Sequence, residues 1–296
     1  MAQKLRKASP FDVFRLVLVG AIWGAAFIFI SIAIETFEPI TIAAVRVALA
    51  AIILTAVSVV IRHSFPATLS DWRRVTVVGL FNSAIPFFLI SWGQQYTSSA
   101  EAALLMATGT FCALLISHFT TTDERINWPR GVGVLIGFSG VFVLVVVELM
   151  QTGLGGLKGQ IAVMAAGASY ATSSVLARRI SHLPAISTSA AIMASASCYL
   201  IPLALIFEHP LTIELNASAV LSILFLGVIA TAFAFVVRFA VIRDNGAVFM
   251  AQVGYLVPLF GVLWSWLFLS EAITVQTWVA LVCIVIGIAF TRKGVK

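Results

Sequence analysis

Arg46 is the residue whose chemistry differs most from its surroundings. It stands inside a long apolar stretch, residues 39–61, seven residues from its start. A charged side chain deep in a membrane helix costs about 2.5–3.5 kcal/mol on insertion scales and is rarely left facing lipid. Such an arginine either anchors an anionic group such as a carboxylate, or is structural and reaches the membrane surface or the carbonyl groups of a neighbouring helix. Both interpretations require something polar to face it.

Three aromatic residues, Trp23, Tyr170 and Tyr255, lie near the middle of other apolar stretches. Membrane tryptophans are normally found at the two interfaces with water, and a buried Trp or Tyr needs a partner for its N–H or O–H group. A solvated cavity would supply such partners, whereas lipid would not. The alternative is that these rings only pack between helices.

Several smaller polar or adaptable side chains occur at similar depth. Hydrogen bonds between helices explain most Ser and Thr residues in membranes, but the amides of Asn82 and Gln252 are harder to satisfy in that way. The candidate substrate-binding residues are therefore Trp23, Arg46, Asn82, Met106, Thr110, Tyr170, Thr231, Gln252 and Tyr255.

No group of residues within the apolar stretches has catalytic or metal-binding spacing. All twelve Asp and Glu residues lie between the stretches or near their ends, so no carboxylate is placed for a proton relay at the membrane centre. Glu101 and His118 are the nearest titratable groups. Cys112, Cys198 and Cys283 have no paired spacing and are interpreted as packing residues. We therefore expect no catalytic residue, metal or cofactor, and an enzyme is disfavoured.

The composition places these candidates in a membrane. Of the 296 residues, 61% are hydrophobic and only 10% are charged, whereas roughly a quarter are charged in a soluble domain. An apolar run of about 20 residues is long enough to cross the hydrocarbon. The expected transmembrane helices are residues 13–34, 39–61, 74–95, 100–119, 130–148, 158–178, 186–207, 218–240, 246–269 and 275–291. The fold class is therefore an all-α membrane protein with ten transmembrane helices.

The distribution of charge predicts the orientation of these helices. Sixteen of the eighteen Lys and Arg residues, Arg238 among them, fall on the side of the two termini, while Glu residues collect on the other side. Because cytoplasmic loops retain positive charge, we expect both termini in the cytoplasm and a multi-pass protein of the bacterial inner membrane. The basic residues form short clusters between helices, so the net charge of +6 indicates topology and not nucleic-acid binding.

The chain repeats itself at an offset of 147 residues. Trp23, for example, corresponds to Tyr170 (170 − 23 = 147). The two halves, residues 1–148 and 149–296, each hold five predicted helices, and an odd number makes the second half enter the membrane from the opposite side. Inverted repeats of this kind enclose a site near the membrane centre in many transporters. We expect a central cavity between the halves.

The sequence also resembles a known family. Residues 23–27 (Trp-Gly-Ala-Ala-Phe), Pro39 followed by Arg46, and Pro258 followed by Leu-Ser-Glu271 resemble the drug/metabolite transporter superfamily, specifically its ten-helix EamA-type branch. That branch includes bacterial exporters of amino acids and other metabolites. The resemblance implies that helices 1 to 4 and 6 to 9 surround the cavity and that helices 5 and 10 are peripheral.

One departure from the family pattern concerns the fourth helix, where Phe111 stands opposite Pro258 and a proline is usual. Whether both halves bend alike is therefore open. The fifth helix carries Gly133, Gly137 and Gly140, a face of small residues that favours close helix contact. This face would pack on the tenth helix or on a second protomer, so a homodimer is possible and not required.

Together these features predict a secondary transporter that exports small metabolites by alternating access, with amino acids bearing apolar or aromatic side chains as the substrates. Arg46 would attract the carboxylate, and the partners would be that small molecule and the lipid bilayer. A multidrug exporter of the same fold is the first alternative. A passive channel or a membrane-embedded enzyme is disfavoured.

Overall fold

The computed structural model describes residues 8–120 and 126–293, and every regular element in these ranges is a helix. Ten helical runs form the bundle. They are α1 (Pro10–Ala33), α2 (Pro39–Val60), α3–η1–α4 (Leu69–Gly79, Leu80–Ala84, Ile85–Gly93), α5–α6 (Ser99–Leu105, Thr108–Thr120), α7 (Trp128–Thr152), α8 (Leu154–Ala177), α9 (Ala185–Phe207), α10–η4–α11 (Ala217–Leu224, Phe225–Phe233, Ala234–Asn245), α12–α13 (Ala247–Met250, Val253–Leu269) and α14 (Val275–Lys293).

These runs confirm the predicted all-α membrane fold. Eight of them are long and apolar enough to cross a membrane, and residues Val275–Thr291 form a shorter apolar helix. Helix α8 has 24 residues, and its Gly, Ser and Gln residues make it less apolar. The third run begins at Leu69, earlier than the predicted residue 74, because the Thr68 side chain caps the backbone N–H of Asp71. Hydropathy does not detect such a polar first turn.

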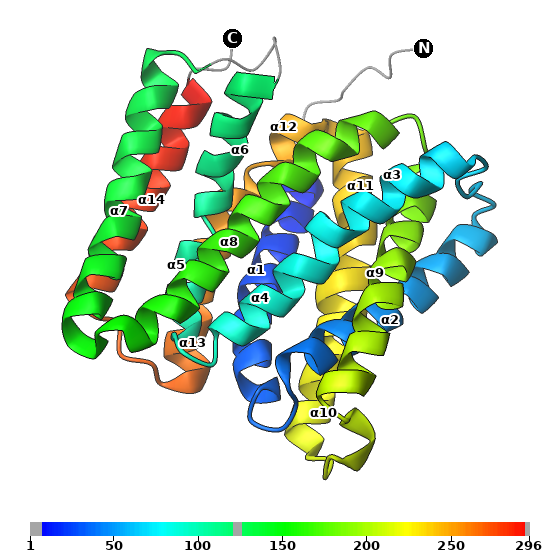
Figure 1. The fold of residues 1–296 in the computed structure, drawn as a ribbon. Helices are drawn as coiled ribbons and strands as arrows, with labels where there is room; N and C mark the ends of the chain where they lie inside the picture. Colours follow the sequence, from blue (N-terminus) through cyan, green and yellow to red (C-terminus); the bar gives the residue numbers. More distant parts are fainter. Residues whose placement is uncertain (1–7, 121–125, 294–296) are drawn as a thin grey trace.

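Helices α7 and α14 lie side by side at one edge of the bundle, as the resemblance implied (Figure 1). A Cβ atom on Gly133 would lie 2.6 Å from the carbonyl oxygen of Gly287, and one on Gly140 would lie 2.8 Å from Cβ of Cys283. Gly133 and Gly140 are therefore packed against α14 within the same chain, whereas the side-chain position of Gly137 faces the Phe111 ring of α6.

Four of the runs are interrupted, in pairs related by the repeat. The π-helical segments η1 and η4 overlap at the 147-residue offset (80 + 147 = 227). Pro86 lacks the N–H group that would continue the α-helix next to η1, and the Thr231 hydroxyl donates to the carbonyl of Leu226 within η4, at 2.8 Å. The breaks between α5 and α6 and between α12 and α13 agree within two residues at that offset. The fourth run is thus interrupted between α5 and α6, although position 111 holds Phe where the family usually has a proline.

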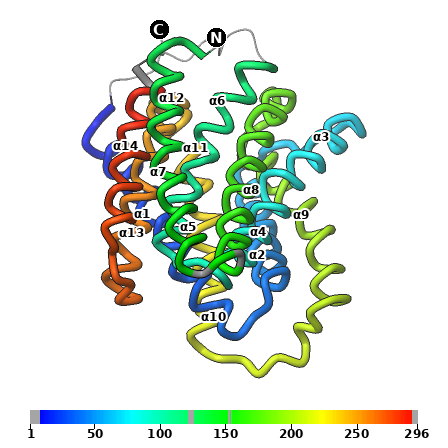
Figure 2. The backbone as a smooth tube through the Cα atoms, turned by 60° about the vertical axis from the view of Figure 1, so that its left-hand side comes forward, coloured from blue at the N-terminus to red at the C-terminus, as the bar shows by residue number. Residues whose placement is uncertain are grey.

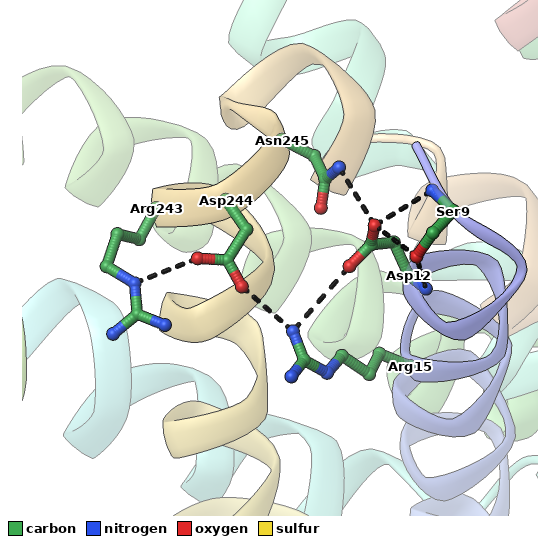
Figure 3. A network of polar contacts seen from close by, with 6 residues as sticks. All are labelled: Ser9, Asp12, Arg15, Arg243, Asp244 and Asn245. Atoms are coloured by element: carbon green, nitrogen blue, oxygen red, sulfur yellow. Dashed lines mark hydrogen bonds and ion pairs between the residues drawn. The ribbon is translucent and has the colours of Figure 1, made fainter. Parts of the chain in front are cut away.

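At the end of the bundle where α1 begins and α14 ends, called here the termini end, a polar network joins the two halves (Figure 3). Arg15 on α1 donates to Asp244 on α11 over 2.9 Å, and the amide of Asn245 donates to the buried Asp12 over 3.3 Å. The residues of this network drawn in Figure 3 are Ser9, Asp12, Arg15, Arg243, Asp244 and Asn245.

At the opposite end, called here the far end, two carboxylates of the second half bind helix N-termini of the first half. Glu208 accepts from the backbone N–H groups of Ile40 at 2.8 Å and Thr41 at 2.6 Å, where α2 begins. Glu271 accepts from the N–H groups of Ser99 and Ala100, each at 3.0 Å, where α5 begins. The first N–H groups of a helix have no partner within it and carry partial positive charge, so a carboxylate stabilises them.

Candidate functional site

The bundle encloses a cavity of about 410 Å³ between the two halves. Its wall comes from α1, α2, the third and fourth runs, α8, and the eighth and ninth runs. None of the described lining residues belongs to α7 or α14. The tube view shows segments distant in sequence lying side by side, for example α4 and α8 (Figure 2). Six of the nine predicted site residues line the cavity: Trp23, Arg46, Asn82, Met106, Thr110 and Tyr170.

Arg46 is 7% exposed and reaches the cavity from α2. Its Nε donates a 2.9 Å hydrogen bond to the hydroxyl of Thr231 on η4. Its guanidinium carbon lies 3.8 Å from the centroid of the Phe87 ring, a cation–π contact. These two contacts orient the group and leave its terminal N–H donors without a hydrogen-bond partner among the described residues. Those donors are available to an anion in the cavity.

Trp23 and Tyr170 lie on opposite halves of the bundle and both line the cavity. The indole N–H of Trp23 donates to the backbone carbonyl of Ala230 at 3.0 Å, and its ring meets Phe235 edge-on. Tyr170 meets Phe87 edge-on. The repeat-related pair therefore forms aromatic walls of the cavity, and the polar end of Trp23 is held by the second half.

Asn82 occupies the π-helical segment η1 and faces α8. Its amide donates to the hydroxyl of Ser83 at 3.1 Å and accepts from the hydroxyl of Ser173 at 3.3 Å. Met106 lies at the break between α5 and α6, and Thr110 lies one turn further along α6. Interrupted helices are common at functional sites, because they expose backbone and re-aim side chains.

The other three predicted residues do not line the cavity. Thr231 is fully buried, and its hydroxyl accepts the hydrogen bond from Nε of Arg46. Gln252 lies at the break between α12 and α13 with an exposed side chain. Tyr255 is half-buried and packs against the main hydrophobic cluster. Sequence depth alone does not distinguish these faces of a helix.

Arg238 also lines the cavity. It was not among the candidate residues predicted from the sequence, because the charge distribution placed it on the cytoplasmic side. It lies on α11, which continues to Asn245, so it stands about two turns inside the helix. Its guanidinium carbon is 5.6 Å from the ring centroid of Phe235 and 5.7 Å from that of Phe239. The signal available in the sequence was its position within the predicted span 218–240.

The cavity is positively charged and opens toward the termini end. Its described lining contains Arg46 and Arg238 and no Asp or Glu, and no group of three metal-ligating side chains occurs in the described ranges. Lining residues toward the far end, such as Ile30 and Ile90, are buried, whereas Ala247 at the termini end is exposed. The arrangement suits a small molecule with an anionic group and an apolar body.

A bundle of two inverted repeats with interrupted helices around a central cavity is the construction of a membrane transporter. The chain belongs to the EamA-like transporter family, whose sequence profile matches residues 11–146 and again residues 157–292. This membership agrees with the resemblance in the sequence and indicates a transporter and not an enzyme.

Two relatives of this chain carry transporter names. It is 24% identical over 286 residues to the uncharacterized transporter YoaV of Bacillus subtilis, covering 95% of this chain and 98% of that protein. It is 25% identical over 279 residues to the uncharacterized inner membrane transporter YedA of Escherichia coli, covering 92% and 88%. A solved crystal structure covers 96% of this chain and 98% of its own, with a TM-score of 0.70 at 19% identity, which shows a shared fold.

Proposed function

We propose that this transporter exports small amphipathic carboxylates across the bacterial inner membrane, with amino acids bearing apolar or aromatic side chains as the first class to test. The observation that carries the proposal is Arg46, a buried cation that is oriented by Thr231 and Phe87 and keeps free donors toward the cavity. Trp23, Tyr170 and Met106 would contact the apolar body of the substrate.

The charge distribution and the opening of the cavity support export as the direction of transport. The termini end carries most of the Lys and Arg residues, which supports a cytoplasmic position for it, and the cavity opens at this end. Substrate would enter from the cytoplasm. Release would require the far end to open by alternating access, since buried side chains and the contacts of Glu208 and Glu271 close it. This closure also favours a transporter over a passive channel.

A multidrug exporter of lipophilic cations is the weaker alternative. The two arginines of the lining would repel a cation, and no carboxylate among the described lining residues would attract it. Uptake of a labelled amino-acid panel into proteoliposomes tests the proposal, with saturable flux expected for apolar or aromatic members. Arg46→Ala should lower that flux at least ten-fold at unchanged yield of folded protein. Absence of saturable flux for every member would contradict the amino-acid assignment, and undiminished flux in the variant would make Arg46 structural.

A further inference from the structure

Arg46 and Arg238 are both cations of one cavity, although they come from different halves of the repeat. Arg46 approaches from α2 and Arg238 from α11, closer to the open termini end. Tyr170 on α8 lines the same cavity as both arginines. The two charges therefore act on the same enclosed volume, and a substrate moving inward from the opening meets Arg238 before Arg46.

Neither arginine is neutralised within the described residues. Among the described residues, the guanidinium of Arg238 contacts the aromatic rings of Phe235 and Phe239. Arg46 contacts the hydroxyl of Thr231 and the ring of Phe87. Other arginines of the same end are paired, for example Arg15 with Asp244. Two uncompensated positive charges in an apolar cavity repel each other, and an anion bound between them removes that repulsion.

The cavity offers much less to a substrate ammonium group. No carboxylate occurs among its described lining residues, so an ammonium would rely on rings, hydroxyls and the amide oxygen of Asn82, while facing two positive charges. We propose that Arg238 is the second anion-binding residue of this cavity and that, with Arg46, it selects carboxylates of net negative charge over zwitterions. This inference rests on the proposed function and narrows its substrate class.

Three ligands that share a phenyl body test the inference: phenylalanine, 3-phenylpropanoate, which lacks the ammonium, and benzylmalonate, which adds a second carboxylate. Binding is measured on the purified full chain by ligand-induced thermal stabilisation, which leakage through a bilayer does not affect. We expect the ligand concentration for half-maximal stabilisation to fall about ten-fold from phenylalanine to 3-phenylpropanoate and about ten-fold again to benzylmalonate. Each of these steps adds one net negative charge, and one charge-assisted contact is worth about that factor.

Arg238→Gln should reduce the advantage of benzylmalonate over 3-phenylpropanoate to within about two-fold. Arg238→Lys keeps the positive charge and should retain part of the advantage of benzylmalonate. It serves as the second variant in case Arg238→Gln does not fold. Arg73→Gln removes one charge from an exposed position outside the cavity and should leave all three ligands unchanged. Binding of phenylalanine as tight as that of 3-phenylpropanoate, or an equal loss for all three ligands in Arg238→Gln, would overturn the inference. Binding of none of them would overturn the proposed function and this inference together.

Discussion

The carboxylate of Glu271 accepts a 3.0 Å hydrogen bond from the backbone N–H of Ser99, across the boundary between the two halves of the chain. Ser99 begins α5, so a loop of the second half stabilises the N-terminus of a helix in the first half. Glu208 makes the same kind of contact with α2. Opening of the far end by separation of the halves has to break both contacts.

Glu271→Gln and Glu208→Gln should therefore favour an open far end, because an amide stabilises helix N–H groups less than a carboxylate does. A cysteine introduced at Ile30, a buried cavity residue near that end, in a chain without the native cysteines, reports this change. We expect a membrane-impermeant maleimide added from the far side to label it at least five-fold faster in the double variant. Glu35→Gln, an exposed far-end control, should have no effect, and equal labelling in all variants would exclude the contacts as a seal.

Thr231→Val should weaken transport without unfolding the protein, because it removes the hydroxyl that receives the Nε hydrogen of Arg46. Lost orientation of the guanidinium should raise KM about five- to ten-fold, corresponding to the roughly 1–1.5 kcal/mol of one hydrogen bond. Ser222→Ala is the matched control, since this buried hydroxyl bonds only its own helix in α10. Equal KM values for the two variants would show that Thr231 does not position Arg46.

Gly287→Ala should destabilise the pair formed by α7 and α14. A Cβ atom there would lie 2.7 Å from the carbonyl oxygen of Gly133 and from the backbone nitrogen of Gly137, so the helices must separate, at a cost of about 1–3 kcal/mol. We expect a lower thermal midpoint with near-normal flux per folded molecule, because neither helix lines the cavity. Gly155→Ala, where no atom lies within 4 Å of the added carbon, should be neutral. Loss of flux at normal stability would contradict a peripheral role.

Arg15→Gln and Asp244→Asn should be coupled in their effect on stability (Figure 3). Their side chains are 23% and 18% exposed and lie 2.9 Å apart, so a coupling of about 0.5–1 kcal/mol is expected for a partly screened pair. Thermal midpoints of the two single variants and the double variant measure it. Strictly additive shifts would mean that this contact contributes nothing to joining α1 and α11.

Much of the fold follows from local properties of the sequence. Span length, apolar content and the 147-residue repeat depend on residues close together or on simple periodicity, and a bilayer admits few alternatives for such segments. Arg46 was identifiable for the same reason, since a charge inside an apolar run needs a polar environment wherever the helix packs.

Tertiary structure decided which face each helix turns inward. Gln252 and Arg238 are both polar residues within the same pair of neighbouring runs, yet only Arg238 lines the cavity. Gln252 lies at the break between α12 and α13, whereas Arg238 lies on α11 just after the π-helical segment η4. An apolar helix face can contact lipid or another apolar helix at nearly the same free energy. The rotation of a helix about its own axis is therefore set by packing against its neighbours.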